Sequence, residues 1–200
     1  MSGPAPSEIA EEDTLRANCY SLLARLLRRP PDAVTLQEVG RLEGDDGEFG
    51  RAVGALAAAA RSTAPETVED EYFNLFIGIT QGELTPYASY YLTGFLNEKP
   101  LARLREDMDR LGIARAENVS EPEDHIAALM EMMAGLITGA FGVPADLALQ
   151  QRFFEQHIAT WAPRFFEDLQ AAQTSNFYMP VGSIGRLFME VETQAFAMAA

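Results

Sequence analysis

The amino-acid sequence predicts an all-α protein, a single globular bundle of about nine or ten helices. Apolar residues recur with a period of about 3.6 in almost every segment, which is the spacing of one helix face. No segment alternates convincingly between apolar and polar residues, as a half-buried strand does. The 200 residues are 48% apolar, which is enough for one well-buried domain.

The first part of the chain contains three predicted helices. The first has an apolar face made of Leu15, Cys19, Leu22, Leu23, Leu26 and Leu27. The sequence RRPP at 28–31 ends this helix, because proline cannot continue it. Asp32 is placed to cap a short successor, and a loop at 43–47 leads into an alanine-rich helix over 49–61. Cys19 is then a small core residue rather than a nucleophile.

The middle of the chain combines helices with a cluster of aromatic residues. Pro65 opens a helix whose apolar side holds Val68, Tyr72, Leu75, Phe76 and Ile79, and two glycines end it. The segment 84–95 is rich in tyrosine, which predicts a short helix lying across its neighbours. Pro100 opens another helix, which ends at Gly112.

A polar linker precedes the last group of helices. We expect a hinge at 114–119 that joins two lobes of one structural domain, residues 1–113 and residues 120–200. Beyond the hinge, Ile126 to Ile137 form the wide apolar stripe of a core helix. Two more helical runs follow, and a final helix carries Ile184, Leu187, Phe188 and Val191.

Charge and composition exclude several classes of partner. The formal net charge is -15, whereas nucleic acids and anionic membranes require basic patches. No stretch of about 20 apolar residues is present, so we expect no integral membrane segment. The first residues do not read as a secretory signal, and a single cysteine excludes an internal disulfide. These features predict a cytoplasmic protein.

The stretch SEPEDHIAAL, residues 120–129, reads first as the start of a helix. Ser120 and Glu123 have the spacing of a capping box, and Pro122 suits a first turn. The acidic residues favour the positive end of the helix dipole. His125 is not explained in this way, because a protonated imidazole is disfavoured there. It therefore marks a candidate site.

Catalytic and metal chemistry find little support in the sequence. Asp124 and His125 are neighbours and point to different faces of a helix, so they cannot form an orienting pair by themselves. Glu-x-x-His, the motif of di-iron bundles, is absent, because Pro122 and Phe154 precede the two histidines by three residues. No phosphate-binding glycine motif occurs. We expect no catalytic residue, no metal and no cofactor.

The tyrosines predict a peptide-binding groove. Tyr87, Tyr90 and Tyr91 fall within five residues, and tyrosine is favoured at protein–peptide interfaces because its hydroxyl needs a partner when buried. For most of these rings, a place in the core is the better interpretation. An apolar groove with the acids of 121–124 at its mouth suits a peptide with an apolar stretch and arginines.

The order of these motifs resembles a known family. EYFNLFIG, then PYASYY, then EPEDH before an apolar helix, and FFEQHIATWAPRFFEDLQ near the end are similar to the TorD/DmsD/NarJ family of redox-enzyme maturation chaperones. The resemblance covers residues from about 14 to 196, and E-P-x-D-H is its most specific element. The family's groove aromatic ahead of LF is a tyrosine here, and tryptophan occurs only at Trp161.

The resemblance implies a cytoplasmic, all-helical chaperone rather than an enzyme. Its partner would be the precursor of a molybdenum- or tungsten-cofactor oxidoreductase, bound by its twin-arginine leader or N-terminal region until cofactor is inserted. The implied groove consists of Tyr72, Leu75, Phe76, Pro86, Tyr87, Ser89 and Tyr91, bordered by Glu121, Pro122, Asp124 and His125. Alanine at Asp124 or His125 is then expected to weaken leader binding and leave stability nearly unchanged.

Some properties stay open at this point. The family resemblance allows weak guanine-nucleotide binding and either a monomer or a domain-swapped homodimer. Two other functions remain as alternatives: a metal- or nucleotide-dependent hydrolase on a helical bundle, and a regulatory adaptor that binds a folded partner.

Overall fold

The computed structural model describes residues 10–115 and 121–199, and within these residues it contains helices and no strand. The helices are α1 (Glu11–Arg28), α2 (Ala33–Val39), α3 (Glu48–Ser62), α4 (Pro65–Tyr72), η1 (Phe73–Ile77), α5 (Ala88–Thr93), α6 (Lys99–Leu111), α7 (Ile126–Thr138), α8 (Leu147–His157), α9 (Ala162–Ala171) and α10 (Tyr178–Ala199). The predicted all-α class is confirmed.

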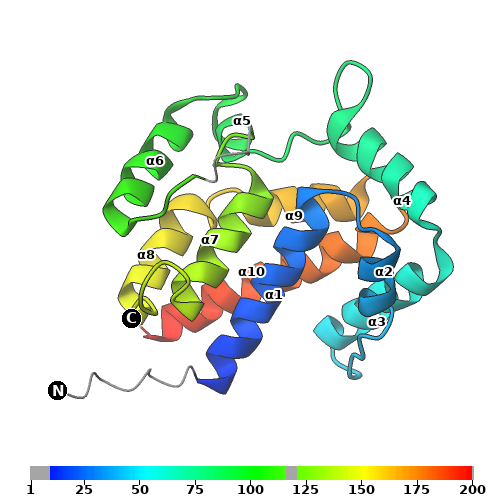
Figure 1. Cartoon of the computed structure of the whole chain (residues 1–200), viewed down its shortest axis with the longest axis horizontal. Helices are drawn as coiled ribbons and strands as arrows, with labels where there is room; N and C mark the ends of the chain where they lie inside the picture. The colour runs from blue at the N-terminus through cyan, green and yellow to red at the C-terminus, as the bar shows by residue number, and fades with distance from the viewer. Residues whose placement is uncertain (1–9, 116–120, 200) are drawn as a thin grey trace.

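Two pairs of helices form the centre of the bundle. α1 packs along α7, and α10 packs along α9 and against α3. Figure 1 shows α1 and α7 side by side in front of α9 and α10, with α2, α3 and α4 on one side and α5, α6 and α8 on the other. The largest fully buried side chains are aromatic: Trp161, Tyr20, Tyr178, Phe154, Phe165, Phe166 and Phe177.

Local sequence signals set several helix ends. The Asp32 carboxylate accepts a hydrogen bond of 2.8 Å from the backbone N–H of Thr35, which caps α2 as expected. α1 ends at Arg28, directly before Arg29 and the two prolines. α6 ends at Leu111, and the next residue, Gly112, has a φ of 67°, a left-handed conformation that favours glycine.

The segment that begins at Pro65 departs from the single predicted helix. α4 ends at Tyr72 and continues as the π-helical turn η1, which stops at Gly78 with φ of 61°. Ile79 lies beyond the end of this helix and is 98% exposed, so it is not part of the apolar side, which corrects the prediction.

The expected hinge falls where the chain crosses from α6 to α7. Residues 116–119 of that hinge lie outside the described residues, so a hinge at 114–119 stays a prediction. One cluster of buried residues draws on segments from both sides of it, because α1 contacts α7 and α3 contacts α10. In the described part of the chain, every helix is too short or too polar to cross a membrane.

Candidate functional site

A cavity of about 510 Å³ opens where the end of α1, η1 and the start of α7 meet. It is lined by Arg28, Arg29, Pro30, Tyr72, Phe76, Ile77, Pro86, Tyr87, Glu121, Pro122, His125, Ala127 and Ala128. Seven of the eleven predicted groove residues are in this set: Tyr72, Phe76, Pro86, Tyr87, Glu121, Pro122 and His125. The structure thus gathers residues far apart in the sequence around one cavity, and their role in peptide binding stays a prediction.

Aromatic rings form one wall of the cavity. The Tyr72 and Phe76 rings lie edge to face with centroids 4.9 Å apart, and Phe76 also contacts the buried Tyr178 at 5.6 Å. The Tyr72 hydroxyl donates to the carbonyl of Arg28 at 3.0 Å, and burial raises its pKa to about 12. This bond satisfies a carbonyl that the end of α1 leaves unpaired and joins the end of α4 to α1.

A second part of the lining is built on a short antiparallel bridge between Tyr87 and His125. The backbone N–H of Ala88 donates to the carbonyl of Asp124 at 3.0 Å, and that of Ile126 donates to the carbonyl of Pro86 at 2.9 Å. The Tyr87 hydroxyl donates to the Glu121 carboxylate. These bonds hold PYASYY and EPEDH together, two motifs that the sequence shows only as separate stretches.

His125 is the N-cap of α7. Its Nδ1 accepts a hydrogen bond of 3.1 Å from the backbone N–H of Ala127, so the ring proton resides on Nε2. Burial lowers the His125 pKa to about 4, so the ring is neutral at pH 7. The sequence-based argument that His125 has no place in a helix start is therefore wrong, because a neutral imidazole is an acceptor. It is also no pH-sensitive contact near pH 6.5.

The predicted capping box does not start α7, which begins at Ile126. Ser120 lies outside the described residues. Glu123 instead accepts hydrogen bonds of 2.9 and 2.8 Å from Arg105, and it lies 3.6 Å from Arg115. Glu123 thus ties the segment before α7 to α6.

Four predicted groove residues do not line the cavity. Leu75 and Ser89 are 0% exposed and Asp124 is 1% exposed. Asp124 accepts a 2.8 Å bond from the backbone N–H of Ser89 and a second bond from the Ser89 hydroxyl, so it holds the first turn of α5. Tyr91 donates to Asp168 at 3.1 Å and packs on Trp161. Side chains alternate along the bridge, so Asp124 faces away from the side that carries His125.

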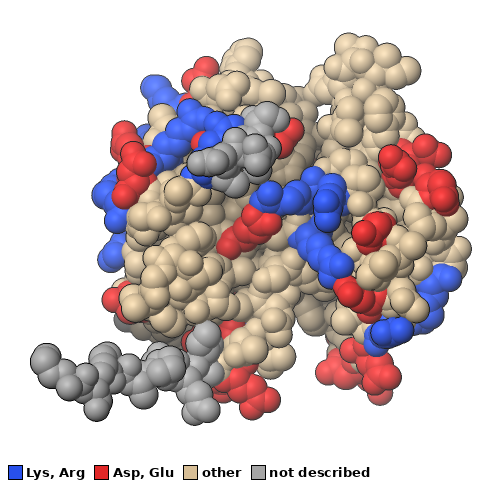
Figure 2. Space-filling model, in the orientation of Figure 1, with Lys and Arg blue, Asp and Glu red and all other residues tan. Residues whose placement is uncertain are grey.

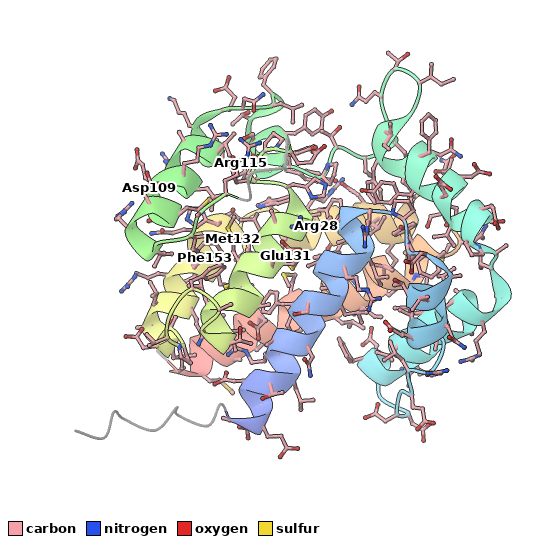
Figure 3. The ribbon with its side chains drawn as sticks, in the orientation of Figure 1. Arg28, Asp109, Arg115, Glu131, Met132 and Phe153 are labelled. Atoms are coloured by element: carbon pink, nitrogen blue, oxygen red, sulfur yellow. The ribbon has the colours of Figure 1, made fainter. Side chains whose placement is uncertain are left out.

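Arg28 and Arg29 also line the cavity, although their position in the sequence indicates only the end of a helix. Arg28 forms an ion pair with Glu131 of α7, and Arg29 forms no ion pair within the described residues. Figure 2 shows basic and acidic side chains meeting near the middle of this face, where Figure 3 labels Arg28 and Glu131. Of the acids of 121–124 that were expected at the mouth of the groove, Glu121 lines the cavity and Glu123 and Asp124 do not.

A carboxylate–imidazole pair does exist, but it lies elsewhere. The His157 Nε2 is 2.7 Å from the Asp107 carboxylate between α8 and α6, and burial lowers the pKa of His157. Neither residue lines the cavity. No group of three or more His, Cys, Asp or Glu side chains among the described residues is placed to hold a metal ion.

Comparison with known proteins agrees with the motif order. The family model described as nitrate reductase delta subunit matches residues 42–167. A TorD chaperone protein of Vibrio atlanticus is 30% identical over 68% of this chain and 67% of its own. One of Aliivibrio fischeri is 26% identical over 96% of this chain and 99% of its own.

A solved structure supports the same fold. The chain of a protein from Archaeoglobus fulgidus, described as a redox enzyme maturation protein, superimposes with a TM-score of 0.57 at 20% identity, covering 94% of this chain and 99% of that one. The relatives named above are chaperones, a non-enzymatic role. This chain therefore belongs to the TorD/NarJ family of redox-enzyme maturation chaperones.

Proposed function

We propose that this protein binds the leader or N-terminal region of a molybdenum- or tungsten-cofactor oxidoreductase precursor in the cytoplasm and holds it for cofactor insertion before export. A leader bound in this way is a twin-arginine leader. The observation that carries the proposal is the cavity at the end of α1, which joins an apolar aromatic wall to a carboxylate.

The apolar wall provides most of the affinity in this proposal. Phe76 is half-buried and Ile77 is 55% exposed, so both present surface that a peptide side chain can cover. Burying one apolar side chain contributes about 1.5–3 kcal/mol, and the cavity has room for a few of them. This matches the apolar stretch of a leader.

The polar groups orient the segment. Glu121 offers a carboxylate to a guanidinium, and the neutral His125 offers its Nε2–H to a backbone carbonyl. The Glu121 contact is exposed, so its contribution falls with added salt, whereas apolar burial and the hydrogen bond of the neutral, buried His125 are not screened in this way. Leader binding is therefore expected to weaken only modestly with salt.

A titration of a labelled synthetic leader tests the proposal. Ile77→Ala and Phe76→Ala are expected to weaken binding about tenfold or more, because each removes apolar contact area. Phe95→Ala is the matched control, since Phe95 is 69% exposed and does not line the cavity. Thermal melts confirm that each variant is folded. Unchanged affinity in Ile77→Ala and in a folded Phe76→Ala would contradict this assignment of the cavity.

A further inference from the structure

Arg28 lies at the junction of three hollows on the face that α1 and α7 share. It borders the cavity of about 510 Å³ described above, which we call the peptide cavity, and a more open hollow along α1 and α7. It also borders a hollow of about 160 Å³ that we call the acidic hollow. The acidic hollow is lined by Arg28, Met108, Ile113, Ala114, Arg115, Glu121, Glu123, Ala128, Glu131, Met132 and Phe141. It shares Arg28, Glu121 and Ala128 with the peptide cavity, so the two spaces adjoin.

The three carboxylates of the acidic hollow differ in their partners. Glu123 is already engaged by Arg105 in a two-donor contact. Glu121 accepts from the Tyr87 hydroxyl. Glu131 accepts from Arg28. In Figure 3, Arg28 of α1 and Glu131 of α7 point toward one another across the seam between the two helices.

The Arg28–Glu131 pair is easy to exchange. The side chain of Arg28 is 39% exposed and that of Glu131 is 48% exposed. Ion pairs at such exposure stabilise a fold only slightly, so opening this one costs little. Arg28 also borders the open hollow beside Ala24 and Gly135, so its guanidinium can move into that hollow when it leaves Glu131.

Glu131 is within reach of a peptide that sits in the cavity. Ala128 lines the cavity, and Glu131 follows it by three residues on α7, so both lie on one helix face. The step between them is about 5 Å along the helix, which an arginine side chain spans easily. A half-buried carboxylate gains more from a planar two-donor guanidinium than from water or a lysine ammonium.

We propose that Glu131 binds an arginine of the bound peptide, and that Arg28 takes the place of this arginine on Glu131 in the free protein. Binding exchanges one guanidinium for another on Glu131, so the number of charge pairs is conserved. This inference rests on the proposed function. It makes Arg28 an internal competitor that lowers the affinity for an arginine peptide and keeps Glu131 paired while no such peptide is bound.

The experiment is a double-mutant cycle between protein and peptide. One labelled leader keeps its two arginines, and a second has both replaced by glutamine. Each is titrated against the wild type, Glu131→Gln, Arg28→Gln and the double variant. Arg29→Gln is the matched control, because it makes the same charge change in the same cavity at a residue that forms no ion pair within the described residues.

The expected pattern is specific to the arginine peptide. Glu131→Gln weakens its binding about fivefold and changes that of the glutamine peptide less than twofold, as a loss of about 1 kcal/mol requires. Arg28→Gln strengthens arginine-peptide binding about threefold, and Arg29→Gln does so less than twofold. In the Glu131→Gln background, Arg28→Gln has no further effect.

Other patterns overturn the inference in distinguishable ways. Equal weakening of both peptides by Glu131→Gln, or equal effects of Arg28→Gln and Arg29→Gln, removes the assigned roles. If both peptides bind the wild type equally and both lose affinity in Ile77→Ala, Glu131 does not recognise a peptide arginine, while the proposed function stands. If the wild type binds neither peptide, both proposals fail.

Discussion

The rings of Tyr87 and His125 meet edge to face, with 5.0 Å between their centroids and 78° between their planes. The same two residues form the antiparallel backbone bridge, so the contact and the bridge support each other. Both residues line the cavity, whereas Ala88 and Asp124, their neighbours in sequence, lie on the other side of the bridge. The bridge therefore links the cavity wall to the start of α5.

Replacing His125 tests its role as a helix cap. His125→Ala and His125→Asn both lose the ring contact with Tyr87, but asparagine retains a side-chain oxygen that can accept from the backbone of α7. We expect the alanine variant to be less stable than the asparagine variant by about 1 kcal/mol, the usual loss for removing a cap. Urea denaturation at pH 7 measures the difference. Equal stabilities would remove the cap assignment.

The lowered pKa of His125 predicts a loss of stability in mild acid. Burial lowers this pKa from 6.5 to about 4, and nearby Arg28 lowers it further while Glu121 raises it. The unfolded state therefore binds the proton more readily, so the contribution is complete above pH 6.5 and is lost toward pH 4. Between pH 7 and pH 5, wild-type stability should fall by about 2 kcal/mol more than that of His125→Asn. Parallel pH curves for the two proteins would contradict this.

Asp124 provides a second test, and the outcome expected from the sequence must be reversed. Asp124→Ala leaves the buried N–H and hydroxyl of Ser89 without their acceptor. Unpaired buried donors cost about 1–3 kcal/mol, so the melting temperature should drop clearly. Asp124→Asn is the control, because its amide oxygen can still accept from Ser89. Weaker leader binding by Asp124→Ala at unchanged stability would restore a direct binding role.

The fold was predictable where the signals are local. Asp32 accepts from a backbone N–H three residues ahead, and Gly112 adopts its left-handed conformation within its own turn, so neither needs a distant partner. The π-helical turn at 73–77 was not predictable in this way. No residue type specifies it, and the helix ends directly after it, so Ile79 lies in solvent rather than on the predicted apolar side.

The site was predictable as a set of residues but not as a geometry. The residues Tyr87 and His125 were named from motifs, and only tertiary contact places their rings together. Neighbouring residues in an extended segment face opposite sides, so proximity in sequence wrongly grouped Asp124 with His125. Arg28 was overlooked because a helix end explained it, and its ion pair with Glu131 joins two segments far apart in the chain.

A buried ion pair anchors α1 to α10. Arg16 contacts Glu192 through two hydrogen bonds of 2.7 and 2.9 Å, and the Tyr20 hydroxyl donates to the same carboxylate at 2.8 Å. Glu192 is 0% exposed, so Arg16→Met leaves a buried carboxylate without its cation. We expect a loss of about 3–5 kcal/mol in the free energy of unfolding.

An exposed pair is the control for that loss. Arg164 pairs with Asp168 at 2.9 Å and its side chain is 71% exposed, so Arg164→Met should cost at most about 1 kcal/mol. Chemical denaturation of the two variants side by side measures the contrast. Similar losses in both would show that the buried Glu192 carboxylate is neutralised or paired in some other way when Arg16 is replaced. Adding Glu192→Gln to Arg16→Met should recover part of the stability, because it removes the uncompensated charge.

Two glycines in helices should respond to alanine in opposite directions. A Cβ on Gly182 of α10 would lie 2.4 Å from the backbone nitrogen of Gln170 and 2.9 Å from the carbonyl oxygen of Phe166, both in α9. Backbone cannot move aside as a side chain can, so Gly182→Ala must push α9 and α10 apart. We expect it to destabilise the fold by about 1–3 kcal/mol or more.

A Cβ on Gly54 of α3 meets nothing within 4 Å, so Gly54→Ala should stabilise the protein by about 0.5–1 kcal/mol through helix propensity and a less flexible unfolded chain. Thermal melts of both variants decide the matter, and a Gly182→Ala protein as stable as the wild type would show that α9 and α10 are not packed this closely.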